Sequence, residues 1–90
     1  MGVKMRVPAP LRKFVGGQEW IELTGRSVGE CLDNLEVQFP GIKQELCDEQ
    51  GQLSAFYDIY VNSESTYPEG LTKPVKNGDE LTVVPIIAGG

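Results

Sequence analysis

Hydrophobic and polar residues alternate in several stretches of the chain, and this pattern predicts β-strands with one face on a core. The stretches are residues 3–7, 18–23, 56–62 and 80–85. In the last one, Leu81 and Val83 are expected to face the core, and Val84 to face outward. Pro85 lacks the N–H that a sheet ladder needs, so this strand is expected to end there.

The first two stretches are expected to pair as a hairpin, because Gly16-Gly17 between them is typical of a turn. In the third stretch, Ile59 faces the core and Tyr60 faces outward. A further short edge strand is expected around Thr66 and Tyr67.

A helix is predicted to begin at Ser27, because Glu30 follows three residues later and completes the sequence pattern of a capping box. Its apolar side chains recur at spacings of three and four, which gives one buried stripe. They are Val28, Cys31, Leu32, Leu35 and Phe39. Pro40-Gly41 ends this helix. In the polar segment that follows, Ile42 and Leu46 are expected to hold one short helical turn against the core.

Asn77-Gly78 is a tight-turn signal that leads into the last strand. The order of elements therefore predicts an α+β domain over residues 1–85, with one main helix covering a mixed sheet of four to five strands. This is the order of a β-grasp fold. Residues 86–90 are expected to form a flexible C-terminal tail.

Composition narrows the classes of function. The 90 residues carry a net charge of −5, which argues against nucleic-acid binding. With no histidine and two cysteines, Cys31 and Cys47, we expect reduced, buried or half-buried thiols and no metal site; an iron–sulfur cluster would need four thiolates. No apolar run is long enough for a membrane span, and no signal peptide is evident at the start, so we expect a cytoplasmic protein.

No group of side chains suggests catalysis, since a catalytic pair needs a base and an obvious partner. Glu45, Asp48 and Glu49 are interpreted as a solvated acidic face. Trp20 and Tyr60, predicted to point outward, are candidates for docking a partner. We therefore expect a protein that is not itself an enzyme and binds no cofactor.

The end of the chain offers a different chemistry. After Pro85 come two isoleucines and Ala88, and then Gly89-Gly90. Five extended residues reach about 17 Å, enough to bring a terminus into a partner's active site. Glycine lets the backbone pass through a slot too narrow for a Cβ. The candidate reactive group is the α-carboxylate of Gly90.

Three segments resemble the ubiquitin-like sulfur carriers related to MoaD and ThiS, and most of all those of the cysteine-biosynthesis type. They are Ile59-Tyr60-Val61-Asn62, Asn77-Gly78-Asp79-Glu80-Leu81 and Val84-Pro85-Ile86-Ile87-Ala88-Gly89-Gly90. The resemblance implies a β-grasp fold whose Gly90 carboxylate is adenylated by an ATP-dependent enzyme of the ubiquitin-activating type. That carboxylate would then become a thiocarboxylate that donates sulfur.

The resemblance also implies partners and a docking face. In the cysteine-type branch the acceptor is a pyridoxal-phosphate enzyme that holds an activated serine derivative, and a metalloprotease releases the product from Gly90. The docking face would use Tyr60, Val84 and Ile86, with Ile87, Ala88 and Gly89 leading to the reactive end.

Other readings stay open at this stage. The carriers of molybdopterin synthesis commonly have a second proline in the tail and a Thr or Ala before the glycines; this tail, Pro-Ile-Ile-Ala-Gly-Gly, has the Ala but no second proline. The pathway could thus be that of cysteine, molybdopterin (with the synthase large subunit as acceptor), thiamine or tRNA thiolation. Outside sulfur transfer, the alternatives are a ubiquitin-like protein modifier and a β-grasp interaction module that never uses its terminus.

Overall fold

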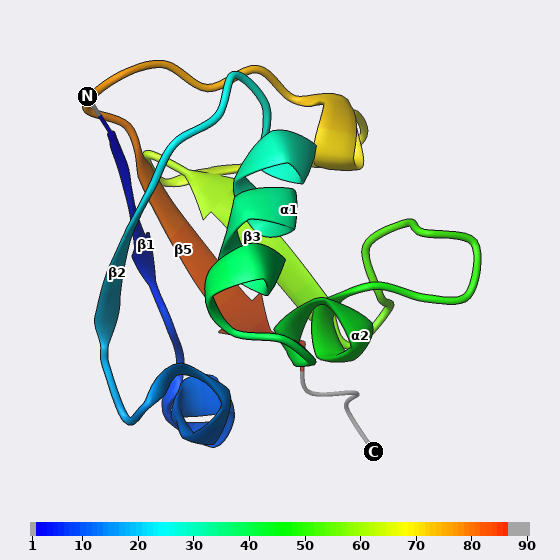
Figure 1. The fold of residues 1–90 in the computed structure, drawn as a ribbon. Coiled ribbons are helices and arrows are strands. Elements are labelled where there is room, and N and C mark those ends of the chain that lie inside the picture. Colours follow the sequence, from blue (N-terminus) through cyan, green and yellow to red (C-terminus); the bar gives the residue numbers. More distant parts are fainter. Residues whose placement is uncertain (1, 87–90) are drawn as a thin grey trace.

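The computed structural model describes residues 2–86 and shows a five-stranded mixed sheet with one long helix packed across it (Figure 1). In chain order the elements are β1 (Val3–Arg6), the 3-10 helix η1 (Ala9–Val15), β2 (Trp20–Leu23), α1 (Val28–Gln38), α2 (Ile42–Leu46), β3 (Tyr57–Val61), β4 (Glu64–Ser65), the 3-10 helix η2 (Gly70–Thr72) and β5 (Glu80–Pro85). This is the ubiquitin-like β-grasp arrangement, as the sequence predicted.

The strand order is β2-β1-β5-β3-β4, so β5 lies at the centre of the sheet. It runs parallel to β1, with Met5 opposite Leu81, and antiparallel to β3, with Ile59 opposite Val83. The last strand of the sequence is therefore hydrogen-bonded on both sides. The N-terminus and the end of β5 lie at opposite ends of the molecule (Figure 1).

The core lies between the sheet and α1, and the predicted inward faces form it. Leu81, Val83 and Ile59 are buried, as are the α1 residues Leu32 and Leu35. Burial of a side chain of this size contributes about 1.5–3 kcal/mol relative to its exposed state. Ile42 and Leu46 of α2 are also buried, which confirms the predicted short helical turn.

The start of α1 follows the capping-box prediction with one difference. Ser27 Oγ accepts a hydrogen bond from the Glu30 backbone N–H at 3.1 Å, as expected. The Glu30 carboxylate accepts from the backbone N–H of Arg26 rather than from that of Ser27. Ser27 instead lies in an isolated antiparallel bridge with Pro74, which joins this end of α1 to the segment before β5.

Two segments differ from the sequence-based expectations. The connection between β1 and β2 contains η1, whose Leu11 and Val15 are buried, and no helix was predicted there. The strands do pair antiparallel, as expected. The short edge strand lies at Glu64–Ser65 instead of around Thr66 and Tyr67, because the positive φ of Asn62 and Ser63 turns the chain tightly after β3.

Candidate functional site: the root of the C-terminal tail

The reactive tail predicted from the sequence begins where the described structure ends. Ile87, Ala88, Gly89 and Gly90 lie outside the described residues. The structure does describe Ile86 and the strand that leads to it. The candidate site is therefore built here from the root of the tail.

The central strand β5 carries the tail. Strand pairing reaches Pro85, which lies opposite Tyr57, and β5 ends at this proline as predicted. One residue later, the Ile86 backbone N–H donates a hydrogen bond of 2.8 Å to the Phe56 carbonyl. This bond holds the first tail residue against the start of β3. No local pattern predicts this bond, because it joins residues thirty positions apart.

The predicted docking residues lie together on one face. Val84 is opposite Asp58, and Tyr60 is opposite Thr82, in adjacent rows of the β3–β5 pair. Because Val83 and Ile59 face α1, Val84 and Tyr60 face away from it. Both are half-buried, and Ile86 is 49% exposed. The structure therefore brings Tyr60 and Val84 to the face of the sheet that points away from α1, here called the open face, and Ile86 to the end of β5. Their contact with a partner remains a prediction.

Trp20 is also on the open face, 44% exposed on the edge strand β2. The Arg6 guanidinium lies over its ring, with Cζ 6.0 Å from the ring centroid, and Arg6 Nε is 3.0 Å from the Glu19 carboxylate. The outward orientation of Trp20 is confirmed. Since β1 and β5 separate β2 from β3, Trp20 and Tyr60 lie at opposite sides of the open face, in one row through Arg6 and Thr82.

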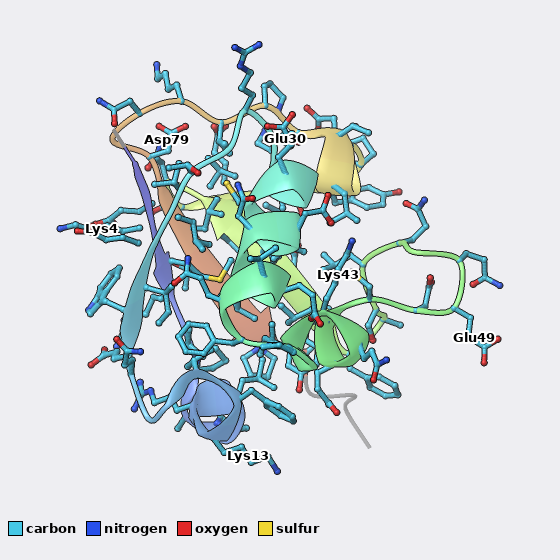
Figure 2. All side chains as sticks on the ribbon, viewed as in Figure 1. Lys4, Lys13, Glu30, Lys43, Glu49 and Asp79 are labelled. Carbon is cyan, nitrogen blue, oxygen red and sulfur yellow. The ribbon has the colours of Figure 1, made fainter. Side chains whose placement is uncertain are left out.

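Two of the segments that carry the family resemblance meet at the other end of β5. Asn62 Nδ2 donates to Asp79 Oδ1 at 2.8 Å, and Asn62 Oδ1 accepts from the Glu80 backbone N–H at 2.8 Å. The hydrogen bond from Asn62, and next that from the Lys76 backbone N–H, lower the pKa of Asp79 below its ordinary value. Asp79 lies near the N-terminus, far from the tail root (Figure 2). These residues thus fix the fold and are not placed to act on the tail.

Neither cysteine is an activated nucleophile. Both are free, with Cys31 buried in the core and Cys47 half-buried. Burial raises the pKa of the Cys31 thiol to about 11, and burial also raises the pKa of Cys47. Because the thiolate is the reactive form, both thiols are poor nucleophiles at neutral pH.

The acidic residues do not form a ligand set. Glu45, Asp48 and Glu49 are exposed, and Glu49 points into solvent from the loop after α2 (Figure 2). Within residues 2–86 no group of three or more Cys, Asp or Glu side chains is placed to hold a metal ion. In the same range no helix is long and apolar enough to cross a membrane.

Comparison with known proteins finds relatives that match this chain over all or nearly all of its length. The sulfur carrier protein CysO of Mycobacterium tuberculosis is 36% identical over 93 residues, with all of both chains covered. A chain in the crystal structure of the Amycolatopsis orientalis BexX/CysO complex superposes with a TM-score of 0.90 at 39% identity, covering 98% of this chain and 99% of that one. Small archaeal modifier protein 3 of Haloferax volcanii is 28% identical over 93 residues, again with full coverage of both chains.

The family model of the ThiS family matches residues 5–90. That match covers the chain from the second half of β1 to residue 90, including α1. Together with the full-length identity to a CysO carrier, it confirms the resemblance that the sequence motifs suggested. The chain belongs to the ThiS family, the family of small ubiquitin-like carriers related to ThiS and MoaD.

Proposed function

We propose that this protein is a sulfur carrier whose working group is the carboxylate of Gly90. The observation that supports the proposal is that the family match continues through residue 90, so the Gly-Gly end lies inside the matched region. The relative from M. tuberculosis is a sulfur carrier protein by name. The last strand before the tail, β5, is paired with a neighbouring strand on both sides, which supports the same role.

The chemistry begins with a carboxylate. An α-carboxyl group has a pKa near about 3.5 and is ionised at neutral pH, so it is a poor acyl donor. In the proposed first step, a Gly90 oxygen attacks the α-phosphate of ATP and pyrophosphate leaves. Hydrosulfide (HS⁻) from a sulfide source then attacks the acyl carbon and forms the C–S bond while the bond to AMP breaks and AMP leaves; loss of the S–H proton gives the thiocarboxylate on Gly90.

The carrier's own part in these steps is presentation. Gly89 and Gly90 have no Cβ, so the backbone can enter a narrow slot in the activating enzyme. Tyr60, Val84 and Ile86 lie where that enzyme would rest against the sheet. The catalytic groups and the ATP site belong to the partner, and no cofactor is required on this chain.

Among the sulfur acceptors, we favour the cysteine-type route because the relatives of this chain include CysO proteins. The acceptor would be a pyridoxal-phosphate enzyme holding an activated serine derivative, and a metalloprotease would release cysteine from Gly90. If the large subunit of molybdopterin synthase captured the thiocarboxylate form and such a pyridoxal-phosphate enzyme did not, the acceptor pathway would be molybdopterin synthesis instead. Thiamine synthesis and tRNA thiolation are the remaining acceptor pathways.

The proposal is tested by intact-mass spectrometry. The protein is incubated with the activating enzyme of its own organism, ATP and a sulfide source. We expect the mass gain of one sulfur replacing one oxygen, located at Gly90 by fragmentation. A variant lacking Gly90 and a variant with a residue appended after Gly90 serve as controls and should gain nothing. An unchanged wild-type mass contradicts the carrier role.

A second function, protein conjugation, is favoured by one comparison. The H. volcanii relative is a modifier protein by name and aligns over its full length. Conjugation would use the same adenylated Gly90 but a lysine amine as acceptor. Isopeptide adducts in cells that disappear when Gly90 is removed would establish it. An interaction module would instead keep its partners when a tag is appended after Gly90.

A further inference from the structure

An open groove lies beside the tail root, and apart from Ile86 its lining residues are not part of the docking face predicted from the sequence. It has a volume of about 290 Å³. It runs between the segment before β3 and the segment after β4, and Ile86 is part of its wall. The lining residues the argument uses are Leu53, Tyr57, Asp58, Tyr67, Pro68 and Ile86.

Exposed apolar side chains concentrate here. In the described part of the chain, five large apolar side chains are exposed. Tyr67, 84% exposed, and Ile86, 49% exposed, both line the groove. Phe56, 71% exposed, is bonded through its carbonyl to the backbone of Ile86. Single exposed apolar residues are ordinary, but three of five around one strand end mark an interaction surface.

The length of the tail ties this surface to the reactive end. Gly90 is four positions after Ile86, and four extended residues span at most about 14 Å. An enzyme that reacts with the Gly90 carboxylate must therefore bring its active site within that distance of Ile86. Since Ile86 is itself a wall of the groove, the enzyme's surface has to pass over the groove or beside it.

We propose that the groove receives an apolar side chain of the enzyme that adenylates Gly90. This inference rests on the proposed function. The adenylating enzyme is the partner to name, because carrier and modifier functions both begin with that step. The groove is open and near the lower end of ligand-pocket volumes, so it suits a side chain better than a cofactor.

The charge of the groove limits which groups can lie beside the partner's apolar side chain. Asp58 is the charged residue among the described residues that line the groove. Its carboxylate accepts hydrogen bonds from Ser65 Oγ at 2.7 Å, Thr66 Oγ1 at 3.2 Å and the Ile59 backbone N–H at 2.7 Å. The carboxylate is thus held in place, and the whole chain has a net charge of −5. An apolar side chain flanked by neutral or basic groups fits this site.

The test measures ATP–pyrophosphate exchange by the activating enzyme at varied concentrations of full-length carrier. The variants are Tyr67→Ala and, independently, Ile86→Ala, because both side chains line the groove and are exposed. The matched control is Val37→Ala, since Val37 is 80% exposed on α1 and does not line the groove. Folding of each variant is checked by its thermal unfolding curve. The reactive end, Gly89-Gly90, is unchanged in all of them.

If the groove is a docking site, each groove variant should raise the KM for the carrier by roughly tenfold with little change in kcat, as expected for loss of an interface anchor. Val37→Ala should match the wild type. If both groove variants show a KM within about twofold of the wild-type KM, the groove assignment is overturned and the carrier role is unaffected. No exchange with the wild type would overturn both.

Discussion

The side-chain amide of Asn62 donates a 2.8 Å hydrogen bond to Oδ1 of Asp79, across seventeen positions of sequence. The same Asn62 accepts from the Glu80 backbone N–H, and its own backbone N–H donates to the Glu80 carbonyl. Asn62 thereby joins the end of β3 to the start of β5. Its positive φ of 50° is a conformation that asparagine tolerates better than most residues.

Removing the acceptor should destabilise the fold. Asp79→Ala leaves the amides of Asn62 and Lys76 without their partner and should lower the free energy of unfolding by about 1–3 kcal/mol. Asn62→Gly removes the same bond while tolerating the positive φ. In urea denaturation, the double variant should lose less than the sum of the single losses, by about 1 kcal/mol. Additive losses would show that the pair is not coupled.

Stability should also depend on pH through Asp79. Its folded-state pKa lies below the ordinary value of 3.8, so its contribution is present above that value and is lost as pH falls through the folded pKa. The stability gap between wild type and Asp79→Asn should be constant from about pH 7 to 5 and shrink at lower pH. Glu49→Gln, at an exposed position, is the control. A gap that stays constant down to about pH 2 would contradict this assignment.

The two thiols should differ in reactivity. Cys31 is fully buried with a pKa of about 11, whereas Cys47 is only half-buried. Alkylation of the native protein near about pH 8 should therefore modify Cys47 at least roughly tenfold faster than Cys31. Peptide mapping after timed quenching gives both rates. The two should become similar in guanidinium chloride, and fast native labelling of Cys31 would refute its burial.

The connection between α1 and α2 depends on one carboxylate. Glu36 accepts from the backbone N–H of Gly41 and of Lys43, both at 2.9 Å, and these two bonds lower its pKa. Glu36→Gln offers one accepting oxygen in place of two. Exchange of the Gly41 or Lys43 amide hydrogen should accelerate by roughly threefold to tenfold, measured by NMR. Glu45→Gln should leave the exchange of both amides unchanged. If both amides exchange in Glu36→Gln as slowly as in the wild type, the Glu36 carboxylate does not hold this connection.

Much of this fold is readable from local sequence. The alternation at residues 80–85 and the helical spacing from Val28 to Leu35 each depend on neighbours within a few positions, and each predicted the buried face. No helix was predicted at η1, because Pro8 and Pro10 directly follow the first alternating stretch and prolines are also typical of a strand end. The spacing of the two buried residues Leu11 and Val15 was the available signal for a helix. Pro10 was compatible with it, because proline fits the first turn of a helix.

The candidate site divides in the same way. Outward placement of Tyr60 and Val84 followed from strand periodicity. The bond from Ile86 to Phe56 and the groove beside Tyr67 depend on which distant segments meet, and a single sequence does not encode that in any local pattern. For the same reason the hydrogen bond between Asn62 and Asp79 could not be predicted, although both residues lie in segments that carry the family resemblance.

The parallel pairing of β1 with β5 has a mechanical consequence. Force applied to the tail in the direction of the chain, with the N-terminus held, pulls β1 and β5 past each other along their length. Their hydrogen bonds then bear the load together instead of opening one at a time, and β3 shares it from the other side. A partner that pulls on the C-terminal end would therefore load these strand pairs in shear, and the domain should resist this force before it unfolds.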